Sequence, residues 1–225
     1  MNESVYILMP AYNEDGVIRE TLKKLIPHFK NIIVVNDGSA DNTEKIAKEF
    51  DVIVLNHKIN LGVGAAAKTG FEYILSQSNA KALVTFDADG QHSVDDAINF
   101  SKEIIQCKEE IIFGSRFLGF EKNVPFTKRF VLKIVNKITN FITGVLLTDA
   151  HNGLKAFKVE AIKKINLELS GYAYESEIIS EIANKKITYK ELPTNIKYTK
   201  YSLKKGQKLR SGLLILEDLL RLRKK

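Results

Sequence analysis

The sequence has little cysteine and no long apolar run, and each shortage excludes a class of protein or site. Cys107 is the only cysteine among 225 residues, so an internal disulfide and a cysteine-based metal site are excluded, and a reducing cytosol suits the chain best. No stretch reaches the roughly 18 consecutive apolar residues typical of a membrane-spanning helix. The first residues lack the basic start and longer apolar segment of a signal peptide. We therefore expect a cytoplasmic protein whose contact with a membrane is peripheral.

Repeats, low-complexity tracts and obvious linkers are also missing from the chain. Apolar residues make up 44% and charged residues 27%, as in ordinary folded proteins. A chain of 225 residues can bury a sizeable core. We expect a single domain over residues 1–225.

The charge is unevenly distributed along the chain. The formal net charge is +7, but residues 1–110 hold 11 basic against 17 acidic side chains, whereas residues 111–225 hold 23 against 10. A cationic second half indicates contact with phosphates, acidic lipid or nucleic acid; the alternative is a solvated lysine-rich surface.

Short apolar runs alternate with amphipathic segments in the first half. The apolar runs are partly β-branched and bounded by Asn, Asp or Gly, which is typical of buried strands. They cover 5–9, 32–35, 52–55, 82–86 and 111–113. Helical patterns cover 17–29, 41–50, 65–75 and 94–107, and capping-box spacing begins at Asp41 and Ser93. This alternation predicts an α/β fold with a mostly parallel, doubly wound sheet and helices on both faces.

The pattern changes after residue 116, where we expect a basic, helical C-terminal part. A long helix is predicted over 127–147, with one apolar face made of Val131, Ile134, Ile138, Ile142 and Val145. The elements expected after it are a strand near 154–157, a helix near 175–184, an extended segment over 187–198 and a helix over about 209–222.

Polar residues and glycines follow the predicted strands of the first half. They occupy 10–14, 36–39, 60–64, 87–92 and 114–116. Parallel sheets bind ligands at the carboxyl ends of their strands. We therefore expect the active site at that edge.

The strongest local signal is Asp87-Ala88-Asp89-Gly90-Gln91, directly after an apolar strand. It places two carboxylates and an amide oxygen together, and Mg²⁺ and Mn²⁺ prefer oxygen ligands that they share with substrate phosphates. Such a cation would bridge the two phosphates of a sugar nucleotide. The competing interpretations are an Asp/Gly turn and a calcium loop, although the spacing does not fit an EF-hand.

Other strand ends allow two interpretations each. Asp37 either accepts hydrogen bonds from a uracil or guanine base or from ribose, or it begins a turn. Glu14 either holds a ribose hydroxyl or favours the start of the next helix. Gly62-Val63-Gly64 fits part of a dinucleotide fingerprint, but it follows the third strand rather than the first. We expect its glycines to allow close approach of the backbone to a nucleotide.

Taken in order, these motifs resemble the family-2 glycosyltransferases. The matching segments are Pro10-Ala-Tyr-Asn-Glu14, Asn36-Asp-Gly-Ser39 with Asp41-x-Thr43, Asn60-x-Gly62-x-Gly64, Asp87-x-Asp89-Gly-Gln91-His92 and Gly114-Ser-Arg116. Within the family, the sequence is most similar to dolichol-phosphate mannose synthases and bacterial polyprenyl-phosphate sugar transferases, over about residues 5 to 212. The resemblance implies a GT-A type fold and inverting transfer of a hexose from a UDP- or GDP-linked sugar to a polyprenyl phosphate.

The resemblance also implies roles for single residues. Residues 1–116 would form the nucleotide-sugar half, and residues 117–225 would form the acceptor half. The nucleotide positions are Pro10, Tyr12, Glu14, Asp37 and Asp87, and the metal positions are Asp87, Asp89 and Gln91. The catalytic candidates are Asp89, Arg116, Asp149 and Glu175, and the acceptor-side residues are Asn152 and Lys155, within segments similar to the family's acceptor motifs.

Two departures from the family pattern affect these roles. Asn36 stands where the family has an aspartate, which leaves Asp37 to recognise the base or the ribose. The family's basic loop near the end is replaced by residues 198–208, where Lys204, Lys205 and Lys208 are candidates for the diphosphate contact. We place Lys205 among the nucleotide-binding residues.

The chemistry of the acceptor decides whether a general base is needed. A lipid phosphate is already charged near neutral pH, because its second ionisation lies near pH 6, so positioning and electrostatic stabilisation suffice. A hydroxyl of a polysaccharide or other glycoconjugate would instead need a carboxylate to remove its proton, and Asp149, Glu175 and Glu177 are the candidates. A non-catalytic nucleotide-binding or membrane-associated module is an alternative of another class.

The predicted helix over 127–147 bears on the partner. A cationic helix with an apolar stripe can lie at a membrane surface, or it can pack on the core with its lysines in solvent. Together with the basic end of the chain at 221–225, it favours peripheral contact at the cytoplasmic face of a membrane. No nucleic-acid motif is present, so we expect no nucleic-acid partner.

Overall fold

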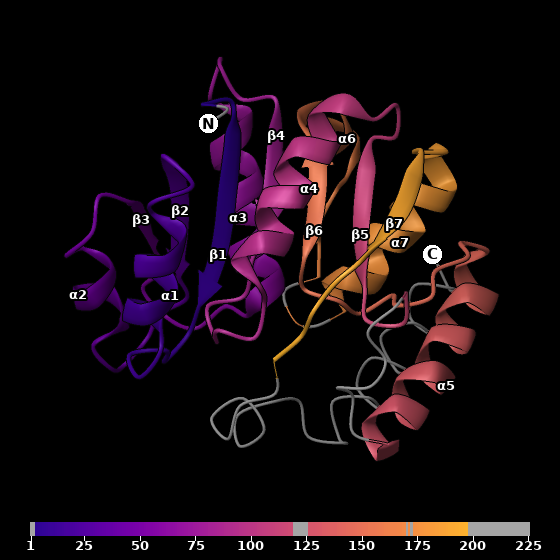
Figure 1. The fold of residues 1–225 in the computed structure, drawn as a ribbon, viewed down its shortest axis with the longest axis horizontal. Coiled ribbons are helices and arrows are strands. Elements are labelled where there is room, and N and C mark those ends of the chain that lie inside the picture. Colours follow the sequence, from indigo (N-terminus) through magenta and orange to yellow (C-terminus); the bar gives the residue numbers. More distant parts are fainter. Residues whose placement is uncertain (1–2, 119–125, 170, 172, 198–225) are drawn as a thin grey trace.

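The computed structural model describes residues 3–118, 126–169, 171 and 173–197 (Figure 1). Seven strands within these residues form one sheet in the order β3-β2-β1-β4-β6-β5-β7. The strands are β1 (Val5–Ala11), β2 (Asn31–Asn36), β3 (Ile53–Asn56), β4 (Ala82–Thr85), β5 (Ile111–Ser115), β6 (Lys155–Lys158) and β7 (Tyr189–Pro193). Strands β1 to β4 run parallel, β7 is parallel to β5, and β6 is antiparallel to both of its neighbours. The mostly parallel sheet predicted from the sequence is therefore confirmed.

Helices cover both faces of the sheet because its strands are apolar on both sides. The helices are α1 (Ile18–Leu25), α2 (Thr43–Ala47), α3 (Val63–Leu75), α4 (Val94–Gln106), α5 (Phe126–Thr143), α6 (Val159–Lys164) and α7 (Tyr174–Lys185). Along β1, Tyr6 and Leu8 pack in a core with α3, α6 and α7, whereas Ile7 and Met9 pack in a second core with α1, α2 and α4. The central strands are thus packed between helices on both faces of the sheet. This packing fixes the position of the polar residues that follow each strand.

Helix α5 differs from the helices that cover the sheet. It lies beside the end of the sheet that carries β7, contacts α7, and extends past the edge where the loops gather (Figure 1). The helix ends at Thr143 and not at the predicted residue 147, because Gly144 adopts a positive φ of 71°. Ile134, which the sequence pattern placed on the apolar face with Val131, is 42% exposed.

Other local predictions need correction. Neither predicted capping box forms. The N-cap residue of α2 is Asn42, and Asp41 accepts the backbone N–H of Thr43. Ser93 makes no side-chain cap, and the Asp96 carboxylate accepts the backbone N–H of Asn195 instead. Helix α6 was not predicted, since six residues are too few to show a helical period.

Some predictions fall outside the described residues: Lys205, the helix over about 209–222 and the basic end of the chain. Among the helices that are described, none has the length and apolar character needed to cross a membrane.

Candidate active site

A cleft of about 450 Å³ opens at the carboxyl ends of the strands. Its lining residues come from the loops after β1, β2, β3, β4 and β5, from the turn before β6 and from the start of α7. Leu132 of α5 and Ile196 after β7 also line it. The predicted site residues that line the cleft are Pro10, Tyr12, Glu14, Asp37, Asp87, Asp89, Gln91, Arg116, Asn152 and Glu175. Residues far apart in the sequence thus share one concave surface, as expected for an open α/β sheet.

The acidic loop after β4 brings two carboxylates to the cleft. Asp89 accepts hydrogen bonds from the backbone N–H and the side-chain amide of Gln91. Burial, together with the neighbouring charge of Asp87, raises the pKa of Asp89 above its usual range. The Asp87 side chain is 47% exposed, and its Oδ2 lies 2.9 Å from Nε2 of the buried His92. Each carboxylate is therefore oriented by its own partner.

The turn before β6 packs against this loop. A Cβ atom built on Gly153 would lie 2.1 Å from Oδ2 of Asp87. The Thr85 hydroxyl donates a 2.6 Å hydrogen bond to the Gly153 carbonyl and so holds the turn in place. Only glycine leaves room for the Asp87 carboxylate here.

The donor set fits a divalent cation that is shared with a substrate. Among the described residues, no three His, Cys, Asp or Glu side chains converge as a closed metal site. Asp87, Asp89 and Gln91 line the same cleft, and Mg²⁺ commonly takes one or two carboxylates plus substrate phosphates. Burial is the main cause of the raised pKa of Asp89, and the charge of Asp87 adds to it; a cation would relieve this second contribution.

The loops after β1 and β2 hold each other by hydrogen bonds. The backbone N–H groups of Asn13 and Glu14 donate to the hydroxyls of Ser39 and Thr43, at 3.0 and 2.7 Å. Asp41 accepts the N–H of Asp15 at 3.1 Å. These contacts hold the two loops side by side. Tyr12, which is 43% exposed, lies at the cleft.

Asp37 is buried, and its carboxylate forms hydrogen bonds with residues that follow β3. Its Oδ1 lies 2.7 Å from Nδ1 of His57 and accepts the N–H of Leu61 at 2.9 Å, and its Oδ2 accepts the N–H of Gly62 at 2.8 Å. These bonds attach the end of β2 to the loop before α3. Gly62 lines the cleft, and an added Cβ on Gly64 would lie 2.2 Å from the carbonyl oxygen of Leu169.

Arg116 and Asp149 form a buried pair beside the cleft. The guanidinium donates two 2.6 Å hydrogen bonds to the Asp149 carboxylate and one of 2.9 Å to the His151 carbonyl. Burial alone would raise the pKa of Asp149, but the Arg116 charge lowers it below its usual range. Glu191 of β7 accepts the backbone N–H of Thr148 and Asp149 and so supports the same loop.

Glu175 lies between two nitrogen groups. Its oxygens are 3.1 Å from Nδ1 of His151 and 3.1 Å from Nζ of Lys155. Burial would raise its pKa, but the Lys155 charge and the His151 contact lower the pKa to about 2. Lys155 is itself buried and donates to the Asn152 carbonyl. Asp149 and Lys155 thus lie beneath the cleft surface.

Comparison with known proteins agrees with this arrangement. A sequence model described as "Glycosyl transferase family 2" matches residues 6–166. The chain belongs to this family. The acidic loop and the loops after β1 and β2 all lie within the matched part of this glycosyltransferase.

Two relatives and one solved structure extend the comparison. A UDP-N-acetylglucosamine–dolichyl-phosphate N-acetylglucosaminyltransferase of Methanococcus voltae is 35% identical, over 97% of this chain and 96% of that protein. A polyprenol monophosphomannose synthase of Mycolicibacterium smegmatis is 28% identical, over 83% and 75%. The crystal structure of glucosyl-3-phosphoglycerate synthase from Mycobacterium tuberculosis with UDP aligns with a TM-score of 0.72 at 14% identity, covering 98% of this chain and 80% of that one. This likeness confirms the GT-A type α/β fold.

The contacts of three histidines of the site were not predicted, although the sequence placed His92 within the acidic motif. His57 contacts Asp37, His92 contacts Asp87 and His151 contacts Glu175. His92 ends the acidic motif, and its closeness to Asp87 was the one available signal in the sequence. The other two histidines lie 20 and 24 positions from their partners, a separation that no local pattern reveals.

Proposed function

We propose that this family-2 glycosyltransferase transfers a hexose, with inversion, from a UDP- or GDP-linked sugar to a polyprenyl phosphate. The observation that carries the proposal is the shared cleft, in which the acidic loop and the Arg116 loop face a common space. The names of the relatives from Methanococcus voltae and Mycolicibacterium smegmatis, which refer to dolichyl-phosphate and polyprenol, support the acceptor class.

Residues 1–116 would bind the donor. Pro10, Tyr12, Glu14 and Asp37 lie along the part of the cleft suited to a nucleoside, next to the acidic loop. Asp87, Asp89 and Gln91 would hold Mg²⁺ or Mn²⁺, which when bound stabilises the negative charge of the departing diphosphate. Glucosyl-3-phosphoglycerate synthase has been crystallised with either ion together with UDP, which supports this choice. We assign a diphosphate contact to Lys205 from the sequence alone.

Residues 117–225 would serve the acceptor, and the carboxylates of this half favour a phosphate. Asp149 is fully paired with Arg116, and Glu175 has a pKa of about 2. Burial raises the pKa of Glu177, but Glu177 is not among the described residues that line the cleft, and it accepts the backbone N–H groups of Glu168 and Leu169. A general base at neutral pH needs a pKa near the working pH and access to the substrate proton. An ionised phosphate needs no such base, and Arg116 with Asn152 and the turn around Lys155 would place it beside the donor.

An assay of acceptor choice tests this proposal. Labelled donor sugar would be incubated with Mn²⁺ and either polyprenyl phosphate or the same polyprenol without its phosphate. We expect the label to enter the organic phase only with the phosphate. Label found in an aqueous oligosaccharide acceptor would instead favour a hydroxyl acceptor, and no transfer of any kind would favour a non-catalytic binding module.

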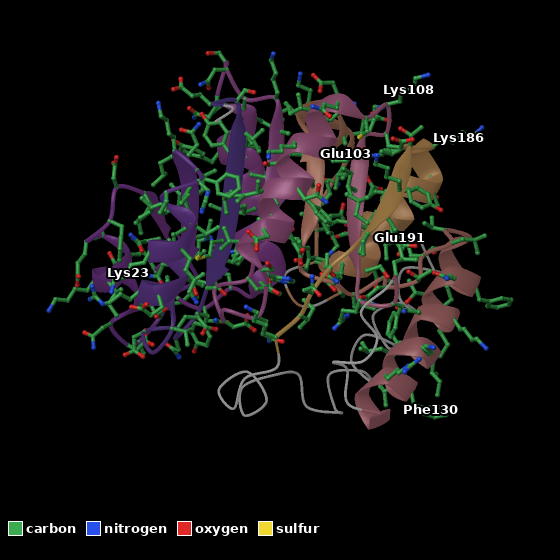
Figure 2. All side chains as sticks on the ribbon, in the orientation of Figure 1. Lys23, Glu103, Lys108, Phe130, Lys186 and Glu191 are labelled. Atoms are coloured by element: carbon green, nitrogen blue, oxygen red, sulfur yellow. The ribbon has the colours of Figure 1, made fainter. Side chains whose placement is uncertain are left out.

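We also propose contact with the cytoplasmic face of a membrane through α5. Its exposed apolar residues are Phe130, Ile134 and Phe141, and Leu146 follows the helix. Phe130 points away from the body of the protein near one end of α5 (Figure 2). Exposed Lys133 and Lys137 lie between these apolar positions, a combination that suits an anionic lipid surface.

A further inference from the structure

His57 is a half-buried histidine next to the donor part of the cleft, and it has no role in the proposed transfer. Its side chain is 9% exposed, with Nδ1 2.7 Å from Oδ1 of Asp37 and Nε2 2.9 Å from the Thr69 hydroxyl of α3. An ionised carboxylate only accepts hydrogen bonds, so Nδ1 must carry the proton and donate it. In the neutral ring Nε2 then accepts from Thr69. Both ring nitrogens are therefore used, and the imidazole has one orientation.

The hydrogen bonds to Asp37 limit what this carboxylate can offer to a ligand. A carboxylate has about four positions for accepting hydrogen bonds, two on each oxygen. His57 and the N–H of Leu61 occupy both positions on Oδ1, and the N–H of Gly62 occupies one on Oδ2. One position on Oδ2 is left for a ligand at the cleft that Asp37 lines.

The common nucleobases differ in the number of donors that they present to a carboxylate. Uracil in a nucleotide has a single ring N–H, flanked by two carbonyl oxygens. Guanine has a ring N–H beside an amino group, and these two donors together match both oxygens of one carboxylate. A carboxylate with one remaining position can satisfy uracil, but it leaves one guanine donor without a partner. A buried donor without a partner costs binding free energy.

We propose that His57 is a specificity-determining residue that restricts Asp37 to a single ligand N–H and so selects a uridine donor over a guanosine donor. The inference rests on the proposed function, because it assumes that a nucleotide base lies against Asp37. Thr69 contributes by holding the imidazole from α3.

Titration calorimetry of the full chain with UDP and GDP, each in the presence of Mn²⁺, tests the inference first in the wild type. A net hydrogen bond to a charged group is worth about 1.5–3 kcal/mol, so we expect UDP to bind at least about tenfold more tightly than GDP. Equal binding, or tighter binding of GDP, would overturn the inference and leave the proposed transfer intact. Binding of neither nucleotide would overturn both.

Variants then test His57 itself. The readout is the ratio of the dissociation constants of UDP and GDP, because a general loss of stability lowers both affinities together. In His57→Ala one position on Oδ1 opens, and we expect the preference for UDP to fall by about tenfold. His57→Asn keeps an N–H donor near Nδ1 and should retain most of the preference. The matched control is His28→Ala, since His28 is exposed and is not among the residues that hydrogen-bond to Asp37 in the described part of the chain. An unchanged UDP-to-GDP ratio in folded His57→Ala would exclude the role.

Discussion

At the scale of single residues, Gly153 is the position where the smallest change should most affect the acidic loop. A methyl group there would lie 2.1 Å from Oδ2 of Asp87, so Gly153→Ala must displace this carboxylate. We expect the affinity for Mn²⁺ to fall by about 10- to 100-fold, as when a metal ligand loses its support. The melting temperature should fall by only about 2–4 °C, because Gly153 itself belongs to neither core.

A titration of Mn²⁺ followed by electron paramagnetic resonance, with a parallel thermal melt, checks this expectation. The control is Gly171→Ala, since an added Cβ at Gly171 would meet no atom within 4 Å. Equal Mn²⁺ affinities in the wild type and Gly153→Ala would show that Asp87 does not bind the ion.

The sequence predicted the surface residues of the site better than the residues that hold them. Asp87, Asp89 and Arg116 follow buried strands, so the ends of those strands carry them to one edge. The burial of Asp149 could not be predicted, because its partner lies 33 positions away. Pairs of this kind depend on how strands are ordered in the sheet, and a local pattern of residues contains no information on that order.

At the scale of elements, the ion pair between β6 and α7 should make stability depend on pH. The pKa of Glu175 is lowered from 4.5 to about 2 on folding, so the unfolded chain takes up its proton more readily. The stabilisation is complete above pH 4.5 and is lost as the pH falls towards 2. Its full size is about 3 kcal/mol, of which about 1.4 kcal/mol should be lost between pH 6 and pH 3.5.

Urea unfolding of the wild type and of Glu175→Gln over this pH range measures the effect. The variant should be less stable at pH 6, because Lys155 loses its charged partner. Its stability should fall less steeply towards pH 3.5 than that of the wild type. Parallel curves for the two proteins would mean that Glu175 does not titrate as its contacts indicate.

Helices and strands were predictable where the segment was long enough to show a clear repeat of apolar residues. The 13-residue helices α3 and α4 were recognised nearly to their ends. The antiparallel direction of β6 was not, because a strand of four residues gives no sign of its neighbours. The apolar spacing of the sequence continues to Leu147, so the pattern predicted a longer helix. The early end of α5 depends instead on the positive φ of Gly144.

At the scale of the whole molecule, the exposed apolar side of α5 should determine lipid binding. We expect the variant with both Phe130→Ser and Phe141→Ser to sediment less with vesicles of anionic lipid than the wild type, because two exposed aromatic anchors are removed. Added salt should weaken binding of the wild type, since Lys133 and Lys137 attract the anionic surface. Leu75→Ser, at an exposed apolar position of α3, is the control. Undiminished binding of the double variant would exclude α5 as the contact.

The fold gathers the loops after β1 and β2, the acidic loop and the Arg116 loop around one cleft. The central claim is that the acidic loop acts through a cation. The most direct measurement is the rate of sugar transfer from the donor to polyprenyl phosphate, for the wild type with Mn²⁺, the wild type with EDTA, and Asp89→Ala with Mn²⁺. We predict that EDTA and the substitution each lower the rate by at least about a hundredfold, equivalent to about 2.7 kcal/mol of transition-state stabilisation. Equal rates in all three conditions would contradict the claim.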